Sequence, residues 1–133
     1  MIKILFIHQS ADLYGSDKAL LLLVSSLNKE LFKPIVLLPC KGPLEEELIK
    51  SKITYYVLPL VKISRKTFSF IGLFKLPFNI LKSIKALNKV HVKHKINIVH
   101  SNTLAVLGGA IWAKIKGVKH IWHVHEMIVK PYI

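Results

Sequence analysis

The sequence predicts an α/β domain in which a parallel β-sheet is covered by helices on both faces. Short continuous apolar segments, typical of strands buried on both faces, alternate along the chain with amphipathic segments typical of helices. The 133 residues suffice for one domain, and 52% of them are hydrophobic, as a globular core requires. Because connections between parallel strands are right-handed, the favoured strand order is 3-2-1-4-5.

Three strands and two helices are predicted in the first half of the chain. Residues 2–8 form a buried strand, and residues 17–27 form a helix for which Ser16 or Asp17 serves as the N-cap. Pro43 suits the first turn of the second helix, where its missing N–H costs nothing. The remaining elements of this half are a strand at 32–39, a helix at 43–52 and a strand at 53–58.

The second half begins with a long segment, 68–95, that is predicted to be mostly helical. Ile80, Ile84 and Leu87 recur at helical spacing with lysines between them, and an interruption at Pro77 is left open. The elements that follow are a strand at 96–100, a helix at 103–116 closed by Gly117, and a strand at 119–125.

The net charge of +13 is distributed unevenly. No acidic residue occurs between Glu47 and Glu126, a span with fourteen lysine and arginine residues. A field of one sign attracts anionic lipids, nucleic acids or phosphorylated small molecules. A lysine-rich proteome would produce the same composition, so the charge alone does not select a partner.

The single cysteine, Cys40, excludes an internal disulfide and fits a reducing compartment such as the cytoplasm. The apolar run at residues 4–7 is too short for a signal peptide. No stretch has the roughly 20 mostly apolar residues that a transmembrane helix needs.

Three histidines, His8, His100 and His125, stand where predicted strands end. In an open parallel sheet, ligands bind beyond the carboxyl ends of the strands where the strand order reverses, so these side chains would share one crevice. The alternative is that each is simply a polar residue leaving the core. His123, His125 and Glu126 invite a metal site, but no thiolate or helical histidine pair supports it, and we expect none.

The loop before the first helix carries Gly15 and Ser16. Free N–H groups at a helix start suit an anion such as phosphate, and glycine lets the backbone approach it. The chain lacks the GxGxxG and GxxxxGK[ST] patterns, which argues against NAD-binding and P-loop proteins. The alternative is that Gly15 only shapes a turn.

Two stretches resemble the N-terminal domain of family 4 retaining glycosyltransferases, which have the GT-B fold. DLYGSDKALLLLVSSL resembles the glycine loop and first helix, and INIVHSNTLAVLGGAIWAKIKGVKHIWHVHE resembles the fourth strand, small-residue helix and fifth strand. The resemblance implies that residues 1–133 form a single Rossmann-like domain, one half of a two-domain enzyme.

The resemblance also implies roles for individual residues. Gly15 and Ser16 match the loop that approaches the donor diphosphate, with Ser16 in place of a second glycine, as in rhamnosyl- and related transferases. His125 matches the histidine near the reacting sugar and is the catalytic candidate. The acceptor side is assigned to His100 and Asn102 by the resemblance, and to His8 by topology alone.

The implied activity is transfer of a hexosyl or rhamnosyl group from a nucleotide-sugar to a glycan or lipid-linked acceptor in cell-envelope polysaccharide synthesis. The nucleotide-sugar is a co-substrate, and we expect no cofactor or metal. Compared with the family, the chain stops just past the fifth strand, so we expect the domain to be incomplete at its C-terminal end and the donor-binding domain to be absent. Because half a cleft cannot hold both substrates, we expect the chain alone to be inactive and to need a C-terminal domain in cis or in trans.

Segment 61–95 carries aromatic residues, among them Phe74 and Phe78, between lysines. It could lie on an anionic bilayer through Lys82, Lys85 and Lys89, which would make the protein peripheral on the inner face of the plasma membrane. The alternative is that the aromatic rings are buried under the sheet.

The competing function is a non-catalytic basic module that binds phosphorylated ligands or nucleic acid. Nucleic-acid binding favours exposed aromatic residues interleaved with basic ones. Trp112 and Trp122 instead fall at apolar helix and strand positions, so we expect no nucleic-acid partner.

Overall fold

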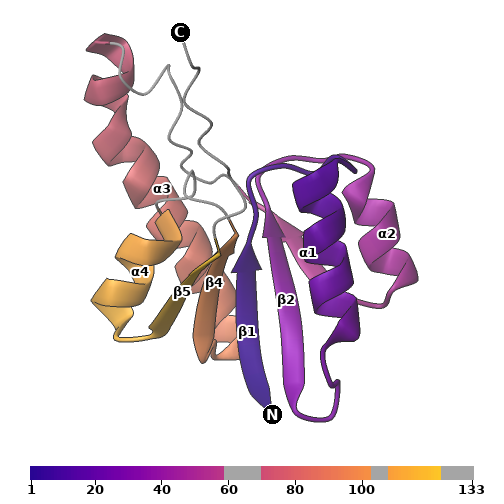
Figure 1. The fold of residues 1–133 in the computed structure, drawn as a ribbon. Coiled ribbons are helices and arrows are strands. Elements are labelled where there is room, and N and C mark those ends of the chain that lie inside the picture. Colours follow the sequence, from indigo (N-terminus) through magenta and orange to yellow (C-terminus); the bar gives the residue numbers. More distant parts are fainter. Residues whose placement is uncertain (59–69, 103–107, 124–133) are drawn as a thin grey trace, which may run out of the picture.

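The computed structural model describes residues 1–58, 70–102 and 108–123 of the chain. It confirms the α/β fold, with strands and helices alternating along the sequence (Figure 1). The strands are β1 (Ile2–Ile7), β2 (Phe32–Leu38), β3 (Thr54–Val57), β4 (Ile98–Asn102) and β5 (Lys119–His123). The helices are α1 (Gly15–Ser26), α2 (Leu44–Lys50), α3 (Phe70–His94) and α4 (Gly108–Lys116).

The five strands form one parallel sheet in the predicted order β3-β2-β1-β4-β5. β1 lies at the centre, with Leu5 opposite Ile35 on β2 and Val99 on β4. β2 and β3 lie on one side of β1, whereas β4 and β5 lie on the other side. The strand order therefore reverses between β1 and β4, and these two strands flank the switch point. The ends of these two strands are therefore where a ligand site is expected.

Each face of the sheet packs against its own pair of helices (Figure 1). α1 and α2 cover one face, where Phe6, Val36 and Leu20 are buried together. α3 and α4 cover the other, where Leu37, Leu87 and Trp112 belong to the second core cluster. Side chains alternate between the two faces of a strand, so both faces of β1 and β2 are apolar.

The glycine pair of the small-residue stretch lets α4 pack closely. A Cβ on Gly108 would lie 2.9 Å from Ser83 Cβ on α3, and a Cβ on Gly109 would lie 2.9 Å from Ser101 Oγ on β4. Trp112 is fully buried, and its indole N–H donates to Asn88 Oδ1 at 2.7 Å. The small residues on one side of α4 and the Trp112 indole together hold α4 closely against α3 and β4.

Several predicted boundaries are wrong by a few residues. α1 begins at Gly15, two residues before the predicted start, and neither Ser16 nor Asp17 is its cap. Asp17 lies instead in the first turn, where its Oδ2 accepts from the Tyr14 N–H at 3.1 Å. β4 runs to Asn102, so His100 lies within the strand and not at its end.

The long helix α3 continues through Pro77 without a break, which resolves the interruption that the sequence left open. Gly117 follows α4 with φ +68°, in the left-handed conformation expected of the residue that closes a helix. The predicted start of the fourth helix and the end of the fifth strand fall at 103–107 and 124–125, outside the described residues.

Candidate functional site

His8 lies directly after β1 and is fully buried. Its Nε2 lies 2.6 Å from Asp17 Oδ1 on α1, and its Nδ1 lies 2.8 Å from Asn102 Nδ2 at the end of β4. With the Asn102 amide donating, Nδ1 is the acceptor and Nε2–H donates to the carboxylate. The imidazole thus joins three elements at the carboxyl edge of the sheet, but no exposed surface remains for an acceptor to touch.

Asp17 is the centre of this network although it is 1% exposed. Its Oδ1 accepts from the Ser10 hydroxyl as well as from His8, and its Oδ2 accepts from the Tyr14 N–H. Burial on its own raises the pKa of this carboxyl, but the hydrogen bonds from Ser10, His8 and Tyr14 outweigh burial and lower the pKa below its ordinary 3.8. Asp17 is therefore ionised at neutral pH.

The loop between β1 and α1 is also held from the side of α2. The buried Ala11 accepts, through its carbonyl, the N–H of Leu44 at 2.9 Å. A Cβ on Gly42 would collide with that same carbonyl, so only glycine fits there. Together with Asp17, this contact fixes the path of the loop that leads to Gly15.

Gly15 itself lies in open space. It is exposed, no atom lies within 4 Å of the position a Cβ would occupy, and its φ is not in the left-handed region. Neither packing nor backbone conformation therefore requires glycine at the start of α1. Ser16 next to it is half-buried. α1 follows β1 directly in the chain, so it begins at the carboxyl edge of the sheet, where β1 and β4 end. The first N–H groups of a helix have no partner within the helix and suit an anion.

His100 lies two residues before the end of β4, opposite Phe6 on β1. Its ring packs against Phe6, with centroids 4.9 Å apart, and against His123 on β5, with centroids 5.3 Å apart. Asn102 pairs with His123 across β4 and β5. These side chains share the α1 face of the sheet with His8, so four polar side chains form one cluster.

Other predicted residues lie away from this cluster or outside the described residues. His125, the catalytic candidate, falls in 124–133, outside the described residues, as does Glu126. Lys82, Lys85 and Lys89 are exposed on α3, on the opposite face of the sheet from α1. Over the described ranges, no three histidine, cysteine or acidic side chains are grouped to hold a metal ion.

Sequence reasoning missed three contributors to this edge: Asp17 as the partner of His8, Ser10 as a second donor to it, and Gly42. Asp17 was considered only as a helix cap. No spacing rule links an acidic residue to a histidine nine positions away in the sequence. Only the rarity of acidic residues in this basic chain could have drawn attention to Asp17.

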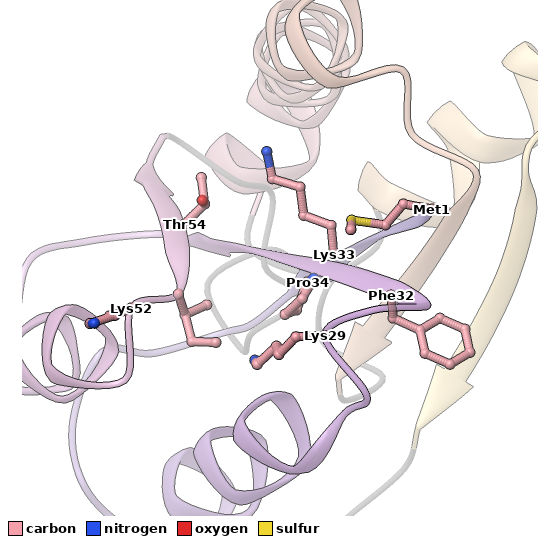
Figure 2. A pocket seen from close by; sticks show the side chains of 8 residues that line it. Met1, Lys29, Phe32, Lys33, Pro34, Lys52 and Thr54 are labelled. Carbon is pink, nitrogen blue, oxygen red and sulfur yellow. The ribbon is translucent and has the colours of Figure 1, made fainter.

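A cavity of about 180 Å³ lies at the opposite end of the sheet, by the starts of β2 and β3 (Figure 2). Lys29, Lys33 and Lys52 line it, but Figure 2 shows their amines pointing apart. The Lys29 ammonium also donates to the Val24 carbonyl at 2.8 Å. The lysines therefore do not converge on a common anion, and the polar cluster at the carboxyl edge is the better site.

No protein-family model and no curated protein matches the chain by sequence. Solved structures do match it. HepE of Anabaena, in complex with UDP and glucose, matches 97% of the chain with a TM-score of 0.68 at 20% identity. A glycosyltransferase of Rickettsia africae matches 98% of it with a TM-score of 0.70 at 19% identity. The chain has the fold of one GT-B half.

This GT-B half spans 31% of the HepE chain and 31% of the Rickettsia enzyme. The same half also resembles part of the UDP-GlcNAc 2-epimerase of Neisseria meningitidis bound to UDP-GlcNAc, over 98% of the chain with a TM-score of 0.57 at 16% identity. At such identities the likeness establishes the fold and not the reaction.

Proposed function

We propose that this chain is the acceptor-binding half of a retaining glycosyltransferase. It would receive a glycan or lipid-linked acceptor, while a donor-binding half, in cis or in trans, holds the nucleotide-sugar. The matched transferases are about three times as long as the chain, which fits a second half. The proposed setting is the cytoplasm, in cell-envelope polysaccharide synthesis, with no metal or cofactor.

The observation that carries this proposal is the open helix start at Gly15. The fold leaves a glycine there without a structural need for it, next to a loop fixed by Asp17 and Gly42. The N–H groups at the start of a helix can donate to diphosphate oxygens, and a rigid loop lets them do so without reorganising. HepE carries UDP in a two-domain relative of this fold, which favours a nucleotide diphosphate as the anion.

In this proposal the polar residues divide by exposure. Gly15 and Ser16 approach the donor diphosphate, and the half-buried His100 lines the acceptor side. Asn102, predicted for the acceptor side, is as fully buried as His8 and positions that ring instead of contacting the acceptor. His125 acts near the reacting sugar. His8 takes a different role from the one expected from sequence: being buried, it positions the glycine loop and Asn102 and does not contact the acceptor.

The test is a transfer assay on the longest polypeptide that the gene encodes, with any separately encoded donor half added. Radiolabelled UDP- and dTDP-sugars are supplied together with glycans and lipids extracted from the source cells. We expect label in a glycan or lipid fraction only when both halves are present, and none from the 133 residues alone. Transfer by the 133-residue chain alone would contradict the proposal.

The likeness to the Neisseria epimerase favours one second candidate, half of a UDP-sugar epimerase. An epimerase converts the nucleotide-sugar without any acceptor. In the same assay it would yield an isomeric sugar nucleotide while glycan and lipid fractions stay unlabelled, so the two functions give different products.

A further inference from the structure

Helix α3 presents an outward stripe that no contact within the sheet explains. Its inward stripe, Ser83, Ala86, Leu87 and Val90, is buried against the sheet and α4. The outward stripe carries Phe74, Phe78 and Leu81, which are 74%, 62% and 55% exposed. These three side chains follow one another by four and three residues, so they lie on one side of the helix. Large apolar groups this exposed indicate an interaction surface.

Three exposed lysines continue the same stripe toward the end of α3. Lys82, Lys85 and Lys89 follow at intervals of three and four residues and are exposed. From Phe74 to Lys89 the stripe is about 22 Å long, at the rise of an α-helix. Figure 1 shows that the first turns of α3 run past α4 and beyond the end of the sheet.

The charge of the domain is divided between its two faces. Six of the seven acidic residues lie within the first 47 residues, mostly on and around α1 and α2, and α3 has none. α3 lies on the opposite face of the sheet (Figure 1). The outward stripe therefore combines exposed apolar side chains and lysines on a helix that has no acidic residue. This combination is complementary to an anionic lipid surface.

We propose that the outward stripe of α3 binds an anionic membrane surface, with the two phenylalanines and Leu81 entering the interface and the three lysines lying against lipid phosphates. A nucleic acid bound through its phosphates would use the lysines alone, and a single strand stacked on the phenylalanines would leave Leu81 without a role. A protein partner would not require the three lysines. The exposure of both kinds of side chain on one stripe favours lipid. This inference stands apart from the proposed transferase function.

Sedimentation of the full 133-residue chain with vesicles tests this inference. Vesicles of phosphatidylcholine that contain about 30% phosphatidylglycerol are compared with vesicles of pure phosphatidylcholine, each at low and at high salt. We expect binding to the anionic vesicles that high salt abolishes. The triple variant Lys82→Gln/Lys85→Gln/Lys89→Gln should lower partitioning roughly 100-fold, because each lysine near the surface contributes severalfold.

Two further variants separate the alternatives. Phe74→Ser/Phe78→Ser should lower partitioning about tenfold with an unchanged circular dichroism spectrum, because both side chains are exposed. The matched control, Lys18→Gln/Lys41→Gln/Lys50→Gln, removes the same charge from exposed positions on and near α1 and α2 and should bind like the wild type. Equal loss in this control overturns the proposal.

Three other results also overturn it: no binding to anionic vesicles, equal binding to neutral ones, or wild-type binding by the phenylalanine variant. Single-stranded RNA is added as a second ligand. If the phenylalanine variant binds RNA like the wild type and the Lys82→Gln/Lys85→Gln/Lys89→Gln variant does not, the stripe is a nucleic-acid surface and the lipid proposal is overturned.

Discussion

Both ring nitrogens of His8 are engaged by protein side chains, and this shapes the whole edge of the sheet. The ring connects the end of β1 with the first turn of α1 and the last residue of β4. Because Asp17 is ionised and buried, its hydrogen bonds are charge-assisted and stronger than neutral ones. His8, which the sequence predicts to contact a ligand, therefore stabilises the candidate site through buried hydrogen bonds instead.

Replacing this carboxylate tests the network. Asp17→Asn keeps the shape but loses the charge, and we expect the free energy of unfolding to fall by about 2 kcal/mol at neutral pH. The folded protein lowers the pKa of Asp17 below 3.8, so its contribution is present above pH 3.8 and is lost as the pH falls through the folded-state value. Urea unfolding at pH 7 and pH 3 measures both.

Asp12→Asn is the matched control, because Asp12 is exposed and lies in the same loop. It should change stability little at either pH. An equal loss from both substitutions would mean that the loop depends on negative charge in general and not on the contact between Asp17 and His8.

The two glycines near the edge should respond oppositely to alanine. Gly42→Ala places a Cβ against the Ala11 carbonyl and should cost about 1 to 3 kcal/mol. Gly15→Ala enters open space and should leave the melting temperature within a few degrees of the wild type, while it weakens binding of a nucleotide diphosphate in the two-domain enzyme. Differential scanning calorimetry and ligand titration measure the two effects. If Gly15→Ala unfolds the domain, the glycine is structural.

Among the elements, the long helix α3 is tied to the edge strand β3 through a buried histidine. His94 Nε2 lies 2.6 Å from the Tyr56 hydroxyl, and the two rings meet edge to face. Burial, and then the charges of Lys33, Lys93 and Lys3, lower the pKa of His94 below its ordinary 6.5. The packing of α3 on the sheet thus depends on a neutral imidazole.

This arrangement predicts a loss of stability in mild acid. The unfolded chain binds a proton on His94 near pH 6.5, whereas the folded chain resists it, so stability falls as the pH drops below about 6.5. His94→Gln should be less stable at pH 7.5 but lose less between pH 7.5 and pH 5.5. Burial also lowers the pKa of His120, so part of the slope remains. Chemical unfolding across this range measures it, and an unchanged slope would contradict the role of His94.

Sequence patterns predicted the elements well because hydrophobic periodicity is a local property. The alternation of strand-like and helix-like segments, the right-handed connections and Gly117 were sufficient for the strand order and the end of α4. Boundaries failed where a tertiary contact decides them. Asp17 is drawn into the first turn of α1 by His8 and Tyr14, and Pro77 stays within α3 because preceding turns and packing carry the helix through it.

The candidate site was less predictable, because it depends on side chains that meet only in the fold. Topology predicts His8 at the edge where β4 ends, and there its ring meets Asn102, 2.8 Å away and 94 residues distant in sequence. Burial decides that His8 faces inward, and no periodicity encodes that. The collision that makes Gly42 necessary is between two loops and likewise has no local pattern.

At the scale of the whole molecule, the domain has two functional directions. The carboxyl edge of the sheet, with Gly15 and His100, is the edge that would face the partner half in the proposed function. The outward stripe of α3 lies on the other face and carries a separate, positively charged apolar surface (Figure 1). Across residues 1–58, 70–102 and 108–123, no helix is long and apolar enough to cross a bilayer.

The central claim is that ligands bind at the carboxyl edge of the sheet, where the glycine loop meets β4. Its most direct test is nuclear magnetic resonance on the ¹⁵N-labelled chain together with its donor-binding half, during titration with UDP-glucose. The account predicts shifts of the Gly15 and Ser16 amides and of the Asn102 side-chain amide. Shifts confined to Lys29, Lys33 and Lys52, around the cavity at the other end of the sheet, would contradict it.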